Sequence, residues 1–418
     1  MNILVINQPS RNHGDEAAHL ALMRSLAARY PEAGFTVLFV GMSEREVAPI
    51  RCDMPGIRYV VLPLKGSARL PSLAIRHGMD ALAEKLHPVY RKIGKLMDGA
   101  DFILNAPGGM DMGGFRTWSH LFYLLMAVRR KKPVAYYARS IGPFGTSTPA
   151  DRKFLRISEK LLGSFCFLSL RDAKSMEFAR ELGVAALQTI DTAFLERPRK
   201  SVPGVWKERL GEDYLVFVPN ELRRLVGLGA ADAGKVARFA LAVLDLLARR
   251  HPECRIAMLP QLFGRANGGD EAWFSRLRAE SPHRERVAVL PDTLSSDVQQ
   301  TLISSAKLMV GARYHSVVFA LNNQVPFVSL TYEHKMTGLL QLVGQPWREV
   351  PIMGLGTPDF DEQAALARLA CILDRPDFAV LPDPGGPLRL ARENFDAFCR
   401  VLESRVPGGR EGIRGERP

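Results

Sequence analysis

LMVGARYHSVVFALNNQVPFVSLTYEHK, residues 308–335, contains two apolar strand-like segments, and polar side chains follow each of them. Residues 308–310 predict a short buried strand, after which Gly311 permits a tight turn. Residues 327–332 predict a second buried strand. In open α/β sheets, ligands bind outside the carboxyl ends of the strands, so both sets of polar residues are expected at one edge.

The polar residues at these two strand ends suit an anionic substrate. Arg313 and His315 follow the first strand, and Tyr332, Glu333 and Lys335 come at the end of the second. Arginine offers a fork for phosphate or carboxylate, lysine offers a point charge, and histidine can carry a proton near neutral pH. A purely structural alternative is that Arg313 and His315 cap the turn and pair with surface carboxylates.

Strand and helix patterns alternate along most of the chain, which indicates βαβ units and a parallel sheet. A segment rich in proline and charge, 195–213, interrupts the alternation and suits an interdomain connection. The expected strands are 2–7, 35–40, 58–62, 101–105, 133–138, 165–170, 187–190, 214–219, 255–260, 286–291 and two around 308 and 326.

The 418 residues exceed what one hydrophobic core usually serves. We therefore expect two Rossmann-like domains facing a cleft, over 1–200 and 210–360. Helices in 361–406 follow, the last at about 387–404, and these can pack back onto the first domain. Residues 407–418 are expected to form a disordered tail.

Composition indicates an ordinary globular protein, with 47% hydrophobic and 24% charged residues. The five cysteines are scattered, which favours a reducing compartment, and no signal-like or membrane-spanning segment is visible. We expect a cytoplasmic protein. We expect no cofactor and no metal, because the GxGxxG dinucleotide fingerprint is absent after the first strand and no His/Cys/carboxylate set has ligand spacing.

The net charge of +12 and the pI of about 9.6 favour anionic partners. Nucleic acid is not expected, because the positive residues are dispersed and no binding motif accompanies them. Residues 79–97 combine helical apolar spacing with Lys85, Arg91, Lys92 and Lys95. This pattern suits either a core-facing helix, which we favour, or a peripheral contact with the inner face of an anionic membrane.

Two loops of the first domain carry further candidates. Asn12, Gly14 and Asp15 lie between the first strand and the first helix, where backbone N–H groups favour an anion, although Asp15 can equally be a helix N-cap. In APGGMD, Gly108 and Gly109 allow close approach to a ligand and Asp111 can accept a sugar hydroxyl. The remaining candidates for substrate binding are Ser140, Asp191, Arg223 and Gln261.

Taken in order, these stretches resemble the polysaccharide pyruvyl transferase family. The likeness spans about residues 1–345, and it departs from the family's three consecutive glycines where Pro107 replaces the first. The segments that carry it are NHGDE at 12–16, APGGMDMGG at 106–114, ARSIGPF at 138–144, SLRDAKSMEFARELGV at 169–184, IDTAF at 190–194, LPQLFGRANGGDE at 259–271, ARYHS at 312–316 and YEHK at 332–335.

The resemblance implies a GT-B-like enzyme that moves pyruvate from phosphoenolpyruvate to a sugar of an exopolysaccharide or cell-envelope glycan precursor. The product would be a ketal, with phosphate released. The first domain would face the acceptor and the second domain the donor. Arg313, Arg223 and Lys335 would clamp the donor, His315 would be the acid, and Asp111 or Asp15 the base.

Two alternatives remain open at this point. One is a GT-B glycosyltransferase that uses a nucleotide sugar, and the other is a non-catalytic, membrane-associated subunit of glycan assembly. A sugar, a nucleotide sugar and a lipid-linked glycan are all compatible acceptors. The sequence does not decide the acceptor linkage, the oligomeric state, which carboxylate is the base, or whether a divalent metal assists.

Overall fold

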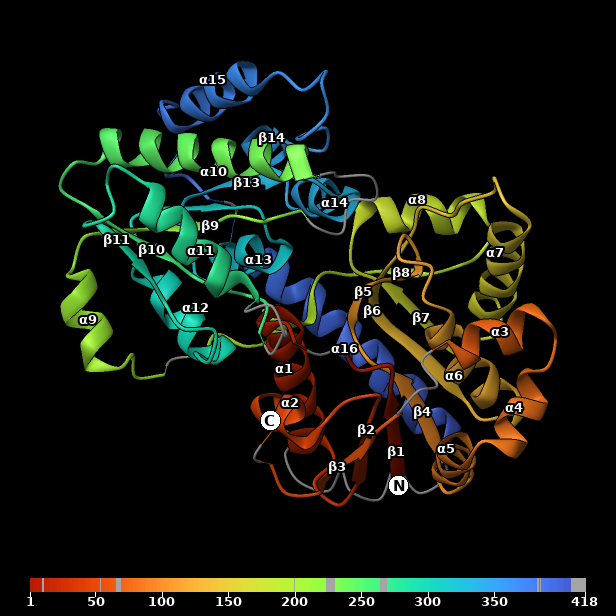
Figure 1. Ribbon diagram of the computed structural model, residues 1–418. Helices are drawn as coiled ribbons and strands as arrows, with labels where there is room; N and C mark the ends of the chain where they lie inside the picture. Colours follow the sequence, from red (N-terminus) through yellow and green to blue (C-terminus); the bar gives the residue numbers. More distant parts are fainter. Residues whose placement is uncertain are drawn as a thin grey trace. The chain divides into compact units, whose positions relative to one another are not determined.

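The computed structural model describes residues 1–418 except 10, 53, 65–68, 199, 223–229, 264–268, 382, 384 and 407–418. The chain divides into two compact units, shown in Figure 1. Unit 1 comprises Met1–Ser10, Ala18–Leu195 and Leu388–Pro418, and unit 2 comprises Arg11–Ala17 and Glu196–Pro387. The segment after the first strand therefore groups with the second half of the chain, which the sequence did not predict.

Unit 1 is built on an eight-stranded sheet in which every pairing is parallel. The order is β3-β2-β1-β4-β6-β7-β8, with β5 paired to β6 beyond the end of β4. The strands are β1 (Asn2–Ile6), β2 (Gly34–Val40), β3 (Ile57–Leu62), β4 (Phe102–Asn105), β5 (Gly108–Gly113), β6 (Val134–Gly142), β7 (Phe167–Leu170) and β8 (Leu187–Gln188).

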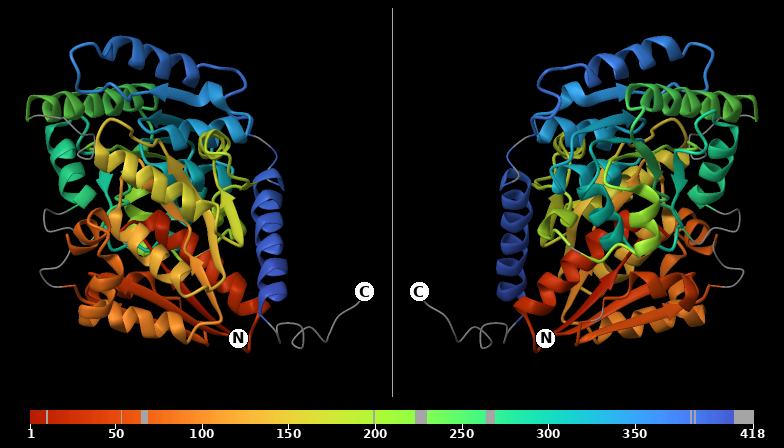
Figure 2. Two further views of the ribbon diagram at one scale, coloured as in Figure 1. Left: turned by 90° about the vertical axis from the view of Figure 1, so that its right-hand side faces the viewer. Right: turned by 90° about the vertical axis from the view of Figure 1, so that its left-hand side faces the viewer.

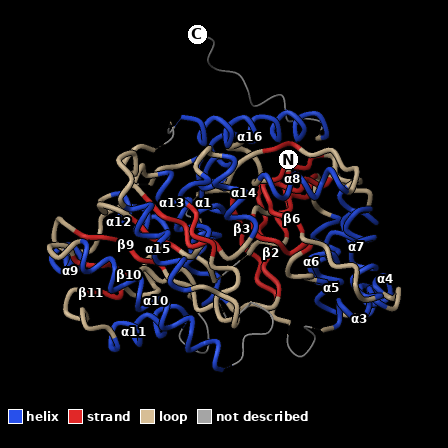
Figure 3. The backbone as a smooth tube through the Cα atoms, turned by 90° about the horizontal axis from the view of Figure 1, so that it is seen from above, coloured by secondary structure: helices blue, strands red, loops and turns tan. Residues whose placement is uncertain are grey.

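Helices surround this sheet, and Figure 3 shows the strands of each unit inside a layer of helices. Aromatic contacts of Phe398 with Phe102, Tyr137 and Phe167 attach the last helix to unit 1. The helices are α1 (His13–Arg29), α2 (Glu44–Val47), η1 (Ala48–Ile50), α3 (Leu70–Arg76), α4 (Asp80–Leu86), α5 (Pro88–Asp98), α6 (Trp118–Arg129), α7 (Pro149–Leu162), α8 (Ala173–Glu181), η2 (Thr192–Leu195) and α16 (Gly385–Arg405).

Two local features of unit 1 concern its helices: the break between α4 and α5, and the packing of α16 beside α1. The helix expected over 79–97 is two helices, because Pro88 starts α5 and holds His87 in an extended conformation. At the other side, Figure 2 shows α16 (blue) passing beside the end of α1 (red), where the Tyr30 hydroxyl donates to Glu403 at 2.8 Å.

Unit 2 contains a six-stranded parallel sheet in the order β11-β10-β9-β12-β13-β14. Its strands are β9 (Tyr214–Val218), β10 (Arg255–Met258), β11 (Val287–Val289), β12 (Met309–Gly311), β13 (Phe327–Thr331) and β14 (Glu349–Pro351). Its helices are α9 (Gly204–Leu210), α10 (Ala230–Arg250), α11 (Gly269–Glu280), α12 (Ser296–Ser304), α13 (Tyr314–Asn322), α14 (His334–Leu342), η3 (Pro346–Arg348) and α15 (Glu362–Leu373).

Both sheets reverse their strand order at the first strand, as Rossmann-like sheets do. β1 lies between β2 and β4, and β9 lies between β10 and β12. Ligands of such sheets bind outside the carboxyl ends of the strands at this switch point. The fold class predicted from the alternation is confirmed as two parallel α/β units, although β5 and β14 were not predicted.

Candidate functional site

Arg313 occupies the switch point of unit 2, where it is the N-cap residue of α13 directly after β12. Its guanidinium forms an ion pair with Asp270, in the first turn of α11, and both side chains are largely buried. The second carboxylate oxygen of Asp270 accepts hydrogen bonds from the backbone N–H groups of Gln261 and Leu262, both at 3.0 Å. Asp270 thus fixes the Arg313 side chain and the chain beyond β10 together.

Two buried donors in this network have no acceptor among the described residues. They are Nε of Arg313 and Nε2 of Gln261, a side chain that is only 1% exposed. A buried donor without a partner costs about 1–3 kcal/mol, so both N–H groups are available to a ligand oxygen. Both are N–H groups, and the network therefore suits an oxygen-rich anion.

His315 lies in the first turn of α13 and is packed against Gly14. A Cβ atom at Gly14 would lie 1.9 Å from both Cγ and Nδ1 of the ring, so only glycine permits this contact. The Tyr314 and Phe319 rings also contact His315, with centroids 5.1 and 6.3 Å away. The two sequence candidates His315 and Gly14 are therefore brought together within unit 2.

Lys335 lies in the first turn of α14 and its ammonium forms a 2.7 Å ion pair with Glu333. Burial alone would raise the pKa of Glu333, but the Lys335 charge outweighs it and the net pKa is lowered. Burial and the Glu333 charge raise the pKa of Tyr332, which keeps its phenol neutral. Lys335 also lies 5.6 Å from the centre of the Tyr314 ring.

The sequence suggested that Arg313 and Lys335 are free cations that clamp the donor, but in the structure each of them is paired with a carboxylate. Asp270 neutralises Arg313 and Glu333 neutralises Lys335. Burial opposes the charge of Arg313, yet Asp270 raises its pKa overall, so the guanidinium stays protonated. Recognition of an anion here would depend on directed N–H donors and on the N-termini of α13 and α14, since the net charge is close to zero.

Buried polar side chains that the sequence analysis missed hold the first turn of α1 in unit 2. His13 Nδ1 lies 2.7 Å from Glu16 and its Nε2 lies 2.7 Å from the Asp292 carbonyl oxygen. Glu16 also accepts from the backbone N–H and hydroxyl of Ser296, at 3.0 and 3.1 Å. The spacing of three residues, which puts His13 and Glu16 on one helix face, was the available signal.

Asn12 contributes to the same turn as a cap. Its side-chain oxygen accepts from the Gly14 N–H at 2.8 Å, and it forms an isolated antiparallel bridge with Leu262. Asp15 is half-buried in the first turn of α1, so the N-cap alternative raised for Asp15 is wrong and Asn12 takes that position. Asn12 is a structural residue of the α1 start and lies next to Gly14, which contacts His315.

In unit 1, Asp111 projects from β5 and is held by two donors. Arg139, fully buried in β6, forms an ion pair with it, and the Thr117 hydroxyl donates to it at 3.0 Å. Burial would raise the pKa of Asp111, but the Arg139 charge and the Thr117 hydrogen bond outweigh it and lower the pKa. Burial lowers the pKa of the neighbouring His120 to about 3, so that ring is neutral.

The two glycines before Asp111 differ in their surroundings. They lie in β5 and not in a glycine turn, which corrects the loop expected from the sequence. A Cβ at Gly108 would lie 2.6 Å from Pro9 and 3.1 Å from the Arg139 guanidinium, so Gly108 serves the packing of the protein itself. At Gly109 the nearest atom would be Phe115 at 3.8 Å, an ordinary contact distance.

Ser140 and Asp191 lie in the interior of unit 1. The Ser140 hydroxyl donates to Asp172 at 2.8 Å and accepts from Arg171, which also pairs with Asp191. Both candidates are fully buried in this network, which favours a structural role over contact with substrate. Asp172 caps α8 through the Ser175 N–H at 2.8 Å.

Arg223, the second predicted phosphate contact, lies outside the described residues. Asn220, just before that segment, donates to the Ala312 carbonyl oxygen at 3.2 Å and accepts from Leu222 N–H at 3.0 Å. It is 8% exposed and ties the end of β9 to the residue before Arg313. Asn220 is thus part of the switch point of unit 2.

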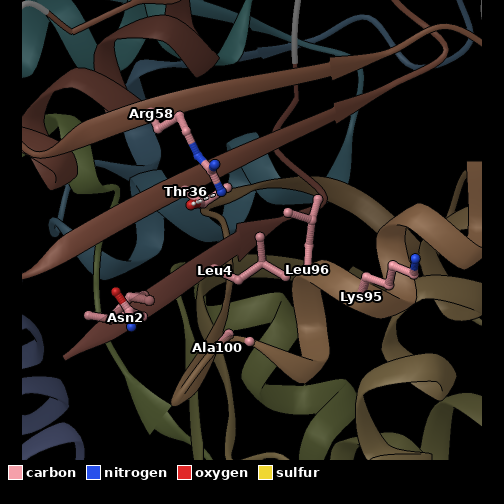
Figure 4. Close-up of a pocket in the computed structure, with 9 residues that line it drawn as sticks. Asn2, Leu4, Thr36, Arg58, Lys95, Leu96 and Ala100 are labelled. Atoms are coloured by element: carbon pink, nitrogen blue, oxygen red, sulfur yellow. Dashed lines mark hydrogen bonds between the residues drawn. The ribbon is translucent and has the colours of Figure 1, made fainter.

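Two other features lie at the amino ends of strands, opposite to the switch points. A depression of about 310 Å³ in unit 1 is lined by Asn2, Thr36, Arg58 and Lys95 among others, and Figure 4 shows Arg58 directed toward Thr36. In unit 2 the ligand atoms of His251, Glu253 and Cys254 lie within 4.8 Å of one another before β10, although Lys307 pairs with Glu253 at 3.8 Å. Neither feature belongs to the candidate site.

The fold and the switch-point residues define a GT-B-like protein, and solved structures agree. The S. aureus MnaA–UDP structure has a TM-score of 0.63 at 10% identity, covering 100% of this chain and 98% of that one. Methanocaldococcus jannaschii UDP-GlcNAc 2-epimerase with UDP-GlcNAc and UDP gives 0.60 at 10%, covering 96% and 99%. Arabidopsis thaliana UGT89C1 with UDP gives 0.54 at 13%, covering 97% and 100%. At these identities the likeness shows the fold alone.

Sequence comparison identifies the family within this class of GT-B-like proteins. Residues 12–334 match the polysaccharide pyruvyl transferase family, so the chain belongs to that family of transferases. Amylovoran biosynthesis protein AmsJ of Erwinia amylovora is 22% identical over 297 residues, which is 68% of this chain and 66% of AmsJ. The chain thus matches just under two thirds of that relative's length. None of the helices in the described part of the chain has the length and hydrophobicity that a bilayer crossing requires.

Proposed function

We propose that the protein transfers pyruvate from phosphoenolpyruvate to two hydroxyls of a sugar in an exopolysaccharide or cell-envelope glycan precursor, forming a ketal. Family membership supports the reaction class. The observation that carries the donor assignment is the pair of buried N–H groups, on Arg313 and Gln261, that have no acceptor among the described residues. Phosphate and carboxylate oxygens are the acceptors that such donors fit.

The proposed donor site is in unit 2. The N-terminus of α13 carries Arg313 and His315, and the N-terminus of α14 carries Lys335. β12 and β13 are adjacent and parallel, so both helices begin at the same edge of the sheet. An anion with two charged groups, such as phosphoenolpyruvate, can therefore receive N–H donors from two helix starts and from the side chains together.

The reaction needs a proton first. Protonation of the methylene carbon of phosphoenolpyruvate makes C2 electrophilic, and a sugar hydroxyl attacks C2 and gives up its proton. The C2–O bond to phosphate then breaks, phosphate leaves with the bonding electrons, and the second hydroxyl closes the ring with loss of its proton. One hydroxyl proton balances the proton used on carbon, and the other leaves with phosphate. His315 is our candidate for the acid.

The proposed acceptor side is in unit 1. Asp111 is 28% exposed and its lowered pKa keeps it ionised, so it suits a hydrogen bond from a sugar hydroxyl better than it suits strong base catalysis. Asp15, half-buried at the start of α1 in unit 2, remains the other candidate base. One of these two carboxylates would accept a hydroxyl proton and pass it to the departing phosphate.

The test is acceptor-dependent phosphate release from phosphoenolpyruvate, followed by mass detection of the ketal. Free sugars, UDP-sugars and lipid-linked glycan extracts serve as acceptors. His315→Gln retains a hydrogen-bonding side chain but cannot cycle a proton at neutral pH, so turnover should fall by roughly 10²-fold or more. His283→Gln, at a partly exposed histidine paired with Asp245, is the control and should keep activity.

If His315→Gln turned over like the wild type, the acid assignment would be wrong. If no acceptor gave phosphate release while a nucleotide sugar was consumed, a GT-B glycosyltransferase would replace the proposal. Inertness toward phosphoenolpyruvate and nucleotide sugars alike would favour a non-catalytic subunit.

A further inference from the structure

Helix α4 presents its apolar side chains to solvent. Met79, Leu82 and Leu86 are 48%, 50% and 66% exposed, and their spacing of three and four residues puts them on one helix face. None of the residues of α4 is buried. Leu73 of the preceding α3 is 49% exposed, and α3 and α4 are neighbours at the margin of unit 1 in Figure 1. Four of the nine strongly exposed large hydrophobic side chains in the described chain thus lie between 73 and 86.

The acidic side chains of α4 point the other way. Asp80 forms an ion pair with Arg129 of α6, and Glu84 forms ion pairs with Arg129, at 2.7 Å, and with Arg130. This arrangement reverses that of an ordinary surface helix, in which charges face water and leucines face the core. It also neutralises the carboxylates of α4 within the protein.

Exposed cations precede, separate and follow these apolar side chains along α3, α4 and α5. Within the described residues, none of these cations takes part in an ion pair, in contrast to Arg129 and Arg130. They are Arg69, Arg76, Lys85, Arg91, Lys92 and Lys95. We call these six cations, together with Leu73, Met79, Leu82 and Leu86, the α3–α5 face.

The charge of the α3–α5 face selects its partner. A second copy docked by a two-fold axis would place one set of cations near the other, which is unfavourable. An anionic lipid surface instead offers phosphates to the cations and an acyl boundary to the leucines and methionine. We propose that the α3–α5 face docks unit 1 on the surface of an anionic bilayer.

This contact would place unit 1, to which the proposed function assigns the acceptor, at a lipid surface. The docking itself involves no substrate, so its test is independent of the reaction. The structure also corrects the preference stated from the sequence. Residues 79–97 include a core-facing helix, α5, whose Tyr90, Ile93 and Met97 are buried, whereas α4 contributes only the partly buried Ala83 to the core.

The experiment is vesicle flotation with the full chain. Vesicles of phosphatidylcholine mixed with phosphatidylglycerol are compared with phosphatidylcholine alone, at low and high salt. We expect binding to the anionic vesicles that weakens with salt. The Leu82→Ser/Leu86→Ser and Lys85→Glu/Lys92→Glu variants should each lower the bound fraction by about tenfold. Binding needs both the insertion of apolar side chains and the attraction of the cations to anionic lipid.

The matched control is Val205→Ser/Met353→Ser, which removes two apolar side chains of unit 2 that are each 62% exposed. It should float like the wild type. Circular dichroism checks folding, and the single variants Leu86→Ser and Lys92→Glu replace any double variant that fails to fold. Equal binding to neutral vesicles, or undiminished binding by the α4 variants, would overturn the proposal. So would sedimentation showing a dimer that the Leu82→Ser/Leu86→Ser variant dissociates.

Discussion

Gly14 packs against the His315 ring in the candidate donor site. We predict that Gly14→Ala destabilises the protein by about 1–3 kcal/mol, because the new methyl group would overlap the ring, whereas alanine would otherwise be favoured in a helix. Phosphoenolpyruvate turnover should fall with it, since His315 must move. Urea unfolding and the phosphate-release assay measure the two effects.

Gly204 provides the matched control in the same unit. It lies at the start of α9, and a Cβ there would have no heavy atom within 4 Å. Gly204→Ala should therefore be neutral or slightly stabilising. A Gly14→Ala protein as stable and active as Gly204→Ala would show that the packing of Gly14 on His315 is wrong.

The lowered pKa of Asp111 makes a prediction about stability and pH. A carboxyl whose pKa is lowered in the folded state stabilises the protein above the ordinary aspartate pKa, about 3.9, and loses this effect as pH falls through the lowered value. The free energy of unfolding of wild type relative to Asp111→Asn should thus decrease on acidification below about pH 4. A difference that stays constant from neutral to acid pH would contradict the Arg139–Asp111 pairing.

The position of a candidate site residue was predictable from the sequence where that residue directly follows a strand. Arg313, His315 and Lys335 lie at the carboxyl ends of β12 and β13 because parallel strands bring their ends to one edge. Their partners were not predictable, since Asp270 pairs with Arg313 across 43 residues of sequence. A much larger separation in sequence hides the contact of Gly14 with His315.

At the scale of the element, the first turn of α1 depends on the buried pair His13 and Glu16. We predict that Glu16→Gln lowers the free energy of unfolding by about 1–3 kcal/mol, because a neutral amide replaces a charged acceptor for His13 and Ser296. Denaturant unfolding followed by circular dichroism measures this loss.

Glu177→Gln is the control for that prediction. Glu177 pairs with Lys174 at the same spacing of three residues, but both side chains are exposed to solvent, at 41% and 31%. An exposed pair contributes little, so the change should stay within about 0.5 kcal/mol. Equal losses in the two variants would mean that the buried pair does not hold the start of α1.

Elements were predicted where their hydrophobic pattern was regular. β1, β4 and β9 read as apolar runs and appear within a residue or two of their expected bounds. β5 was missed because three of its six residues are glycines, which give no strand pattern. The break between α4 and α5 follows from Pro88. The exposed leucines of α4 have the same spacing as the apolar residues of a core-facing helix, so their exposure was not predictable from the pattern.

At the scale of the molecule, the alternation of strands and helices predicted two α/β units, and both sheets have the Rossmann-like order. The unit to which Arg11–Ala17 belongs was not predictable, because it follows from tertiary contacts such as those of His13 with Gln261 and Asp292. Family membership rests on residues 12–334, which include parts of both units.

The identity of the donor is tested most directly by isothermal titration of the protein with phosphoenolpyruvate and, separately, with UDP-GlcNAc. The account predicts that phosphoenolpyruvate binds, that UDP-GlcNAc does not bind as donor, and that Arg313→Ala weakens phosphoenolpyruvate binding by about 1.5–3 kcal/mol, with Arg313→Lys recovering only part. Arg249→Ala, at a 75% exposed arginine of the same unit, should bind like the wild type. Unchanged phosphoenolpyruvate affinity in folded Arg313→Ala, or binding of UDP-GlcNAc alone, would contradict it.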